Sequence, residues 1–355
     1  MGELQLMKGN EAIAEAAIRA GCDAYFGYPI TPQSEVLEYL MSEKAYERTG
    51  MVVLQAESEL AAINMVYGAA STGKRVMTSS SSPGISLKQE GISYMAGAEL
   101  PCLIVNVVRG GPGLGTIQPS QADYFQSTKG GGHGDYRLLV LAPASVQEMS
   151  DFVKLAFDLA FKYRNPALIL SDGVIGQMME KVELFEQQPR ATTFDQSWVT
   201  TGKTPNRERN IITSLNLDPV LQEQHNHHLQ EKYERMKAEV RFERYHCDDA
   251  EYLMVAYGSS ARICQKAVLL AREKGIRVGL LRPITLYPFP SEPLLELSKQ
   301  VKGILSVEMS AGQMIEDVRL AVHDTVKVEH YGRYGGVIHS PEEVLDAFMK
   351  KIVGG

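Results

Sequence analysis

The feature that most constrains the fold is the alternation of short β-branched runs with segments of helical spacing in the first half of the chain. The runs occupy residues 51–55, 75–80, 100–108, 137–142 and 166–171. Such alternation is typical of βαβ units, in which helices join parallel strands. We therefore predict an α/β fold whose first part is a doubly wound parallel sheet.

A change in composition after this region predicts the domain organisation. Residues 186–246 are polar and charged, and within them residues 221–245 have the composition of an exposed charged helix. The α/β alternation then resumes at residue 251 and continues to the C-terminus. We predict a first domain over 1–185, a linker with an exposed helix over 186–246, and a smaller α/β domain over 247–355.

The overall charge and hydropathy narrow the class of protein. The 355 residues carry a formal net charge of −7, and 44% of them are hydrophobic. No basic stripe is present of the kind that nucleic acids or anionic membranes require. The N-terminus lacks the apolar core of a signal peptide, and no apolar run is long enough to span a bilayer. We expect a cytoplasmic protein without nucleic-acid or membrane partners.

The cysteines and histidines give no metal pattern. The four cysteines are far apart and form no C-x-x-C pair. The cluster His225, His227 and His228 lacks the i, i+4 spacing of a paired ligand set, so we interpret it as the solvated face of a helix. We expect no metal site in this chain, and any iron–sulfur cluster would have to be held by another chain.

The stretch GYPITP, residues 27–32, predicts a stiff turn between a strand and a helix. Its two prolines push the residues before them, Tyr28 and Thr31, towards extended geometry, and Pro32 suits the first turn of the next helix. A hydroxyl and free backbone N–H groups at a helix N-terminus favour an anion such as a carboxylate. The same pattern is also typical of a plain strand-to-helix connection.

Two charged residues follow other predicted strands. Glu59 lies in a helix that we expect to begin at Ala56, directly after the run 51–55, and it is either a partner of the helix dipole or a proton-transfer group. Arg109 ends the run 100–108 and opens a glycine-rich loop, where it is either a surface charge or a carboxylate ligand. Parallel strands end at one edge of a sheet, where α/β proteins bind ligands.

Three further motifs have local interpretations. Gly68-x-x-x-x-Gly73-Lys74 departs from a phosphate-binding loop, because a helix precedes it and a strand follows it, so we expect Gly73 to terminate a helix. Residues 79–84 (SSSSPG) predict a polar loop at the end of a strand, which would line the crevice at the ligand-binding edge of the sheet. Residues 129–136 (KGGGHGDY) predict a flexible interface or gating loop.

Four motifs in this order, GYPITP, AESELAAINMVYGAA, SSSSPG and VVRGGPG, resemble the alpha subunit of the 2-oxoacid:ferredoxin oxidoreductases. Two later segments, LLRPITLYPFP and SVEMSAGQMIEDVRLAV, are similar to the second domain of that family, so the resemblance extends over nearly the whole chain. It implies a pyrimidine-binding domain of thiamine diphosphate enzymes, followed by a transketolase C-terminal-like domain. The sequence of these motifs is most similar to that of the branched-chain, 2-oxoisovalerate type.

The resemblance implies roles for residues of the motifs. Glu59 matches the glutamate that binds N1′ of the cofactor's aminopyrimidine and exchanges a proton there, which makes it the expected catalytic residue. Thr31 and Arg109 match residues that bind the carboxylate of the substrate. Tyr28 and Pro29 lie in the same turn and are expected to contact the cofactor.

The resemblance also implies cofactors, partners and a reaction. The family decarboxylates a 2-oxoacid oxidatively to its acyl-coenzyme A with thiamine diphosphate, and it passes electrons to ferredoxin. The GDG-to-Asn run that holds Mg²⁺ and diphosphate is absent, since Ser171-Asp172-Gly173 lacks its first glycine. The chain would therefore be active only with a beta subunit that carries the diphosphate and Mg²⁺, and with gamma and ferredoxin-like subunits that carry iron–sulfur clusters.

Three alternatives stay open at this point, one of which is a thiamine enzyme with another outcome, such as simple decarboxylation. A 2-oxoglutarate-specific member of the same family is the nearest one, because the size and polarity of the substrate pocket are not encoded in a motif. A non-catalytic scaffold subunit of a thiamine diphosphate complex is the remaining one.

Overall fold

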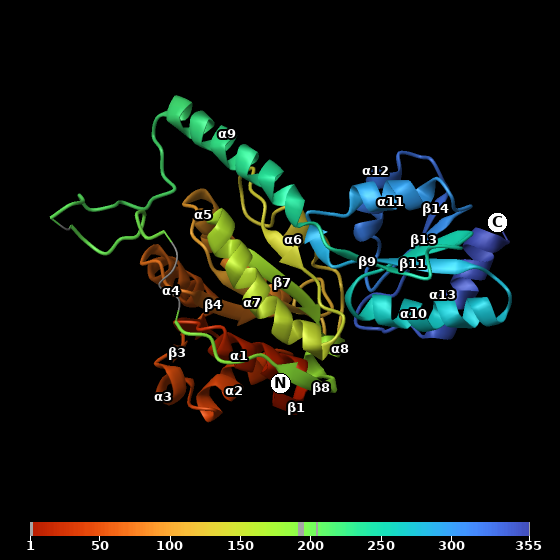
Figure 1. Ribbon diagram of the computed structural model, residues 1–355, viewed down its shortest axis with the longest axis horizontal. Helices are drawn as coiled ribbons and strands as arrows, with labels where there is room; N and C mark the ends of the chain where they lie inside the picture. The colour runs from red at the N-terminus through yellow and green to blue at the C-terminus, as the bar shows by residue number, and fades with distance from the viewer. Residues whose placement is uncertain (1–2, 191–194, 204, 355) are drawn as a thin grey trace.

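The computed structural model of the chain describes residues 3–190, 195–203 and 205–354, which form two α/β lobes, each built on its own sheet (Figure 1). The first lobe contains a seven-stranded sheet in the order β12-β6-β7-β5-β4-β2-β3. Its strands are β2 (Ala24–Gly27), β3 (Val52–Gln55), β4 (Val76–Ser80), β5 (Leu103–Val108), β6 (Leu139–Leu141), β7 (Ala167–Asp172) and β12 (Thr285–Tyr287). All neighbours pair in parallel except β12 with β6.

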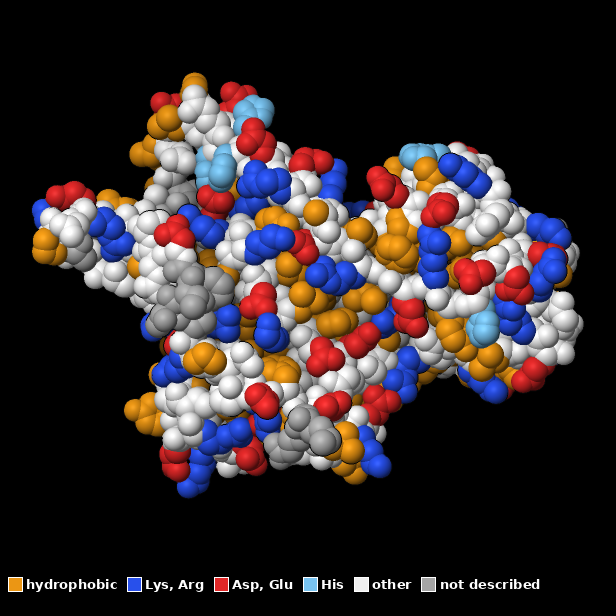
Figure 2. Space-filling view, in the orientation of Figure 1, with side chains coloured by type: hydrophobic (Ala, Val, Ile, Leu, Met, Phe, Trp, Pro, Cys, Tyr) orange, Lys and Arg blue, Asp and Glu red, His pale blue; other side chains and the backbone are white. Residues whose placement is uncertain are grey.

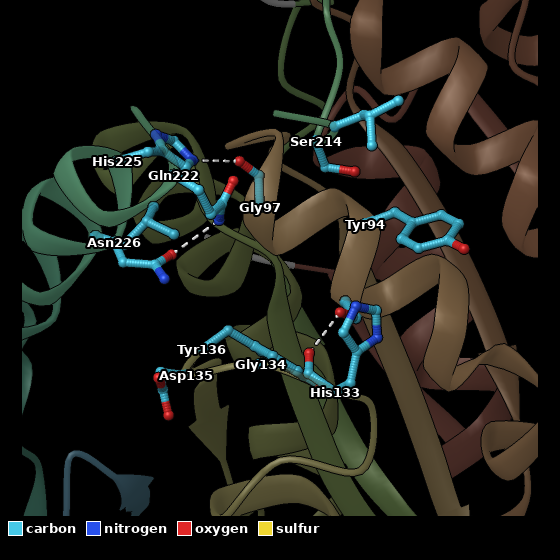
Figure 3. Close-up of a pocket in the computed structure, with 13 residues that line it drawn as sticks. Tyr94, Gly97, His133, Gly134, Asp135, Tyr136, Ser214, Gln222, His225 and Asn226 are labelled. Atoms are coloured by element: carbon cyan, nitrogen blue, oxygen red, sulfur yellow. Dashed lines mark hydrogen bonds between the residues drawn. The ribbon is translucent and has the colours of Figure 1, made fainter. Parts of the chain in front are cut away.

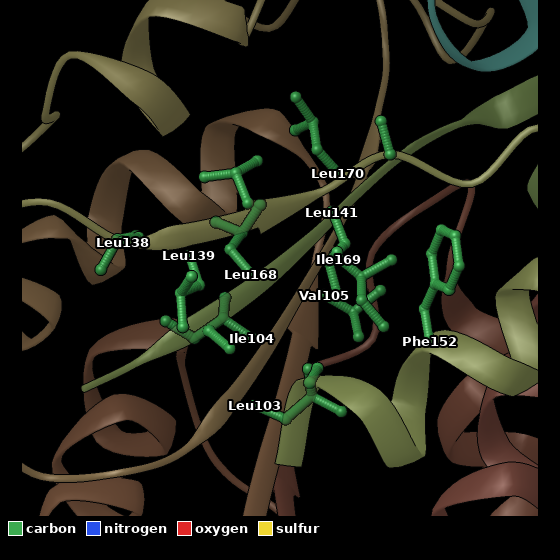
Figure 4. Packing of buried hydrophobic residues seen from close by; sticks show 14 of the residues in the cluster. Leu103, Ile104, Val105, Leu138, Leu139, Leu141, Phe152, Leu168, Ile169 and Leu170 are labelled. Carbon is green, nitrogen blue, oxygen red and sulfur yellow. The ribbon is translucent and has the colours of Figure 1, made fainter. Parts of the chain in front are cut away.

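The core of the first lobe lies around the central strands. Every residue of β5 and β7 is buried, which is typical of a parallel sheet that is covered on both faces. Figure 4 shows side chains of these strands and of β6 packed together, with Phe152 lying beside them. The continuous apolar runs in the sequence thus correspond to the most buried strands.

Helices cover both faces of this sheet. One group packs together and consists of α1 (Gly9–Arg19), α2 (Ser34–Ser42) and α7 (Val146–Tyr163). A second group consists of α4 (Glu59–Ser71) and α5 (Ser82–Gly97), which pack against each other. The short helices are α3 (Ala45–Thr49), α6 (Tyr124–Thr128) and α8 (Gly173–Gln177). A separate antiparallel pair, β1 (Glu3–Lys8) with β8 (Met179–Leu184), was not expected from the sequence.

The strand order creates a switch point next to β2. The chain passes from β2 to β3 on one side, and then returns past β2 to β4 on the other side. Ligands of open α/β sheets bind at the carboxyl ends of strands where the connections change direction in this way. The fold therefore directs attention to the segments that follow β2, β3, β4 and β5.

The second lobe is a smaller sheet in the order β14-β13-β10-β11-β9, at the right of Figure 1. Its strands are β9 (Phe242–Tyr245), β10 (Tyr252–Val255), β11 (Val278–Pro283), β13 (Ile304–Glu308) and β14 (Val328–Gly332). Its helices are α10 (Gly258–Glu273), α11 (Ser291–Ser298), α12 (Met314–Val322) and α13 (Pro341–Phe348), followed by a π-helical turn (Met349–Val353).

The charged segment between the lobes differs from its prediction. Helix α9 (Pro219–Met236) ends in a 3₁₀ turn (Lys237–Glu239), so the expectation of helix up to residue 245 is wrong, and the last four residues form β9 in the second sheet. The helix is also packed on one side, because Leu229, Tyr233 and Met236 recur at helical spacing and are buried. Residues 191–194 and 204 of the predicted linker lie outside the described residues.

One strand from the second half of the chain completes the first sheet. β12 follows β11 after a single residue and pairs antiparallel with β6, which would otherwise be an exposed edge. The two halves are thus joined through the sheet, and the domain boundaries stay a prediction.

The surface shows no concentration of one charge on the face seen in Figure 2, where acidic and basic side chains are interspersed. Within the described ranges, none of the helices combines the length and the apolar character that a membrane span requires.

Candidate functional site

The candidate site lies at the carboxyl edge of the first sheet. The turn 27–32 follows β2, Glu59 follows β3, the residues after Ser80 follow β4, and Arg109 follows β5. The structure therefore brings the predicted site segments to one edge. Their proximity follows from strand order, since β3, β2, β4 and β5 are consecutive neighbours.

Glu59 is the first residue of α4, so the expectation that this helix begins at Ala56 is wrong. The reason is that Ser58 adopts an extended conformation, and its Oγ accepts a hydrogen bond of 3.2 Å from the backbone N–H of Ala61, which makes Ser58 the N-cap. Glu57 therefore lies outside the helix and is exposed. Glu59 is only 6% exposed, and no hydrogen bond joins its carboxylate to another described residue.

The Glu59 carboxylate packs closely against the start of α5. A Cβ added to Gly84 would lie 2.6 Å from Glu59 Oε1 and 2.0 Å from Ser80 Oγ, so only glycine lets these two side chains approach the helix so closely. The hydroxyls of Ser80 and Ser81 are buried and have no hydrogen-bond partner within the described part of the chain. The predicted polar loop 79–84 is thus the end of β4 and the start of α5, because Pro83 suits the first turn of a helix.

Thr31 and Arg109 are joined by a hydrogen bond that involves the backbone carbonyl of Thr31 and not its side-chain hydroxyl. Arg109 Nη1 donates to the backbone carbonyl of Thr31 at 2.9 Å, and Nη2 donates to the carbonyl of Leu114 at 3.1 Å. Arg109 Nε is buried without a partner among the described residues. The Thr31 side chain is exposed, so its hydroxyl is available to a ligand.

The rest of the turn is held by Gln33. Its Nε2 donates to the carbonyl of Tyr28 at 3.3 Å, and its Oε1 accepts from Ser79 Oγ at 2.5 Å. Tyr28 is 36% exposed and Pro29 is half-buried. Helix α2 begins at Ser34, so Pro32 precedes the helix and the expectation that it lies in the first turn is wrong.

Two cavities flank this edge. One, of about 570 Å³, is lined by Arg109 and its glycine-rich loop together with Ser82, Asp123, Gln313 and Tyr334. The other, of about 620 Å³, is lined by Thr31, Gln118, Gly173 and Gln177. The first contains residues of both lobes, so the second lobe helps to shape the site.

Two polar residues near the site were not identified from the sequence motifs. Asp123 accepts from Asn106 Nδ2 at 2.8 Å, and burial raises its pKa. Lys88 is fully buried on α5, and burial lowers its pKa to about 7. Its only signal in the sequence is a lysine at a helical position whose neighbours one turn away are small or apolar.

Asp172 is used within the protein. Its Oδ1 accepts from the backbone N–H groups of Val174 and Ile175 at the start of α8, and its Oδ2 accepts from Ser259 Oγ at 2.7 Å. All four cysteines are buried and unpaired. Among the residues that the structure describes, no group of three or more His, Cys, Asp and Glu side chains is arranged to hold a metal ion.

The remaining motifs are structural. Gly73, which follows the C-cap residue Thr72 of α4, has a φ of +75°, as expected for a glycine that terminates a helix. The interpretation of the histidine cluster as a solvated face is wrong for His225, whose Nε2 lies 2.7 Å from the carbonyl of Gly97 (Figure 3). His133 of the loop 129–136 lies edge-on to Tyr94, and its carbonyl accepts from Ser93 Oγ at 2.7 Å.

Family models match nearly the whole chain. Residues 15–245 match the pyruvate flavodoxin/ferredoxin oxidoreductase family model that describes thiamine diphosphate binding, and residues 250–344 match the pyruvate:ferredoxin oxidoreductase core domain II.

Two curated relatives are similar over their full length. The chain is 54% identical over 353 residues to the ketoisovalerate oxidoreductase subunit VorB of Methanothermobacter thermautotrophicus, covering 99% of this chain and 98% of that protein. It is 36% identical to the 2-oxoglutarate synthase subunit KorA of Archaeoglobus fulgidus, covering 97% of this chain and 98% of the relative.

Solved structures confirm the predicted fold class. A 2-oxoglutarate:ferredoxin oxidoreductase from Magnetococcus marinus, with 2-oxoglutarate, coenzyme A and succinyl-CoA bound, matches with a TM-score of 0.86 and 27% identity. The match covers 99% of this chain and 65% of the longer one, so this chain spans about two thirds of that protein. A split-gene transketolase matches with a TM-score of 0.60 at 14% identity, covering 98% of both chains, and shows the fold alone. The chain therefore belongs to the 2-oxoacid:ferredoxin oxidoreductase family as an alpha-type subunit, which confirms the resemblance in its motifs.

Proposed function

We propose that this chain is the alpha subunit of an enzyme that oxidatively decarboxylates 2-oxoisovalerate to its acyl-coenzyme A and passes the electrons to ferredoxin. The 54% identity to a ketoisovalerate oxidoreductase subunit supports the branched substrate over 2-oxoglutarate, because the 2-oxoglutarate relative is 36% identical. The observation that carries the catalytic role is the buried Glu59 carboxylate without a hydrogen-bond partner in the described part of the chain.

The residues at the sheet edge fit the pyrimidine half of thiamine diphosphate. The Glu59 residue is only 6% exposed and its carboxylate accepts no hydrogen bond from a described residue, and the buried hydroxyls of Ser80 and Ser81 also lack partners among the described residues. Buried polar groups are rarely left unpaired unless a ligand or water pairs with them. When bound, thiamine diphosphate supplies the carbon nucleophile that adds to the 2-oxo group and the electron sink for loss of CO₂.

Glu59 is proposed as the group that holds and exchanges a proton at N1′ of the aminopyrimidine. Its position as the first residue of α4 fixes the carboxylate at the sheet edge, and its low exposure limits competition from water. Tyr28 and Pro29 are proposed to contact the cofactor from the neighbouring turn.

Arg109 and Thr31 are proposed to bind the substrate carboxylate. Two backbone carbonyls hold the guanidinium in place, while its buried Nε remains without a partner among the described residues. A guanidinium positioned in this way is suited to a carboxylate, because it offers several donors in one plane. The exposed hydroxyl of Thr31 adds a further donor.

The diphosphate half of the cofactor is proposed to come from a beta subunit. Asp172 belongs to the segment Ser171-Asp172-Gly173, which partly matches the diphosphate–Mg²⁺ motif. Both of its carboxylate oxygens already accept hydrogen bonds within the protein. Mg²⁺ and the iron–sulfur clusters are proposed to lie on beta, gamma and ferredoxin-like subunits, with coenzyme A as co-substrate. Ferredoxin is the proposed electron acceptor.

The experiment that tests the function measures viologen reduction by the chain purified with its partner subunits. We expect turnover with 2-oxoisovalerate to exceed turnover with 2-oxoglutarate and pyruvate. Glu59→Gln should lower turnover by about 100-fold, as for the loss of a general acid–base group. Glu57→Gln is the matched control and should leave turnover unchanged. Near-normal turnover of Glu59→Gln would remove Glu59 from the mechanism.

The substrate role of Arg109 has a separate test. Arg109→Ala should raise the KM for the oxoacid by about tenfold or more, since a charge-assisted hydrogen bond is lost, and leave the KM for coenzyme A unchanged. Arg164→Ala is the control, because Arg164 is a half-buried cation that lies over Trp198, away from the sheet edge. Equal increases in both KM values would exclude Arg109 from the carboxylate site.

A further inference from the structure

Lys88 is a buried cation that none of the proposed roles uses. It lies on α5 and is fully buried. Its Nζ donates to Thr78 Oγ1 at 2.6 Å and to the carbonyl of Ser79 at 3.0 Å, both on β4. A buried lysine normally forms an ion pair, because removing an ammonium from water is costly. Yet no ion pair joins Lys88 to any described carboxylate.

The geometry places Lys88 on the side of α5 that faces Glu59. Gly84 and Lys88 are four residues apart, so they lie on one face of the helix. A Cβ at Gly84 would meet the Glu59 carboxylate, and a Cβ at Gly91, one turn beyond Lys88, would lie 2.7 Å from Ile63 of α4. Lys88 is therefore located between two positions where α5 approaches α4.

The electrostatics of this region involve one carboxylate. Burial lowers the pKa of Lys88 to about 7, and the charge of Glu59 opposes this shift. Thr78 and Ser79 do not titrate in the ordinary pH range. Tyr25 lies behind Ser79, and burial raises its pKa to about 12, so it stays neutral. Glu59 is thus the charged group that interacts electrostatically with Lys88.

We propose that Lys88 is a positioning residue for Glu59, and that its buried ammonium balances the charge of the Glu59 carboxylate while the carboxylate faces the cofactor. This inference rests on the proposed function, because it concerns the same site. A direct ion pair would occupy the carboxylate oxygens. A cation held by Thr78 and Ser79 compensates the charge and leaves those oxygens free for the pyrimidine ring.

The chain offers a matched lysine with a structural role. Lys232 on α9 is also buried, and burial lowers its pKa to about 8. Unlike Lys88, its Nζ lies 3.2 Å from a carboxylate oxygen of Glu99, so its charge is already paired. Lys232→Met is therefore the control for the loss of a buried lysine elsewhere in the fold.

The first test compares turnover of the Lys88→Met complex and the wild-type complex over a range of pH. At pH 6 Lys88 is charged in the wild type, so the variant should be about tenfold slower, which corresponds to one pKa unit of lost interaction. As pH rises above 7, wild-type Lys88 becomes neutral and the ratio of the two rates should approach one. Lys232→Met should show a ratio that does not change with pH. A pH-independent ratio for Lys88→Met would overturn the proposal.

The second test needs no turnover. It measures thermal unfolding of the complex at pH 6 without cofactor, for Glu59→Gln in the wild-type and in the Lys88→Met background. Glu59→Gln should lower the unfolding midpoint when Lys88 is present, since it leaves a buried cation uncompensated. It should raise the midpoint when Lys88 is absent, since it removes an uncompensated carboxylate. Equal shifts in both backgrounds would show that the two residues are not coupled.

The two tests separate this inference from the proposed function. If the wild-type complex reduces viologen with none of the 2-oxoacids, the proposed function fails. The unfolding cycle still decides whether Lys88 balances Glu59. If the wild-type complex is active but the cycle is additive, only the role of Lys88 fails.

Discussion

Two buried glutamates at the carboxyl edges of the two sheets are alike in burial and opposite in bonding. Glu308 ends β13 and is fully buried. Its carboxylate accepts from the backbone N–H groups of Gln313, Met314 and Ile315 at 2.9, 3.0 and 3.1 Å, and from Ser310 Oγ at 2.7 Å. Glu59 also lies at a helix start beside a sheet edge, but no described residue donates to its carboxylate.

Burial alone therefore does not identify a functional carboxylate. A carboxylate that accepts several N–H bonds at a helix start stabilises the fold, as Glu308 does. A carboxylate that is largely withdrawn from water and left without donors, as Glu59 is, has a cost that a bound ligand would offset. The state of the hydrogen bonds therefore separates the two roles.

A similar contrast holds between particular polar side chains near the two glutamates. At the second sheet, Gln121 of the first lobe fills the edge: its Nε2 donates to the carbonyl of Tyr257 at 2.9 Å, and its Oε1 accepts from Ser260 Oγ at 2.6 Å and Met309 N at 2.9 Å. At the first sheet, the hydroxyls of Ser80 and Ser81 find no such partner among the described residues. Gln121 thus bonds residues beside Glu308, whereas no described residue bonds the two hydroxyls at the end of β4.

The largest expected effect on stability comes from Glu308→Gln. A glutamine has one acceptor oxygen, and its amide would face N–H donors, so the variant should lose about 3 kcal/mol of unfolding free energy. Denaturant unfolding of the complex measures this loss. Glu59→Gln should change the unfolding free energy by much less than Glu308→Gln. Similar losses for the two variants would contradict the distinction between the two glutamates, because Glu59 would then be a structural carboxylate as well.

The sequence predicted the parts of the molecule that depend on local pattern. Buried apolar runs such as residues 100–108 predicted parallel strands, because strands covered on both faces need no polar alternation. Glu59 and Arg109 were located at strand ends by the same pattern, and parallel strands carry their ends to one edge. Gly73 was identified from the order of helix, glycine and strand around it.

The sequence did not predict features that depend on distant contacts. β12 is a three-residue strand whose partner β6 lies more than 140 residues earlier in the chain. The composition of β12 does not indicate which strand it pairs with. Gln121 is one glutamine in a polar loop until the second lobe surrounds it. Lys88 resembles any helical lysine until its burial against β4 is known. The start of α4 was misplaced because several polar residues compete for the N-cap position.

A smaller effect is expected from adding one methyl group where α5 contacts Glu59. Gly84→Ala would place a Cβ 2.0 Å from Ser80 Oγ and 2.6 Å from Glu59 Oε1. These side chains would have to move, so the unfolding free energy should fall by roughly 1–2 kcal/mol and the affinity for thiamine diphosphate should fall with it. Titration of the cofactor into the complex, together with denaturant unfolding, measures both.

Gly68→Ala is the matched control and the smallest expected effect. Gly68 lies inside α4, the helix that Glu59 begins, and a Cβ added there has no neighbour within 4 Å among the described residues. Alanine in a helix interior is more favourable than glycine, so this variant should gain about 0.5–1 kcal/mol of unfolding free energy and keep its cofactor affinity. A loss of affinity in Gly68→Ala equal to that in Gly84→Ala would show that the cofactor senses the stiffness of the helix. The close approach of Glu59 to α5 at Gly84 would then not be the feature on which cofactor binding depends.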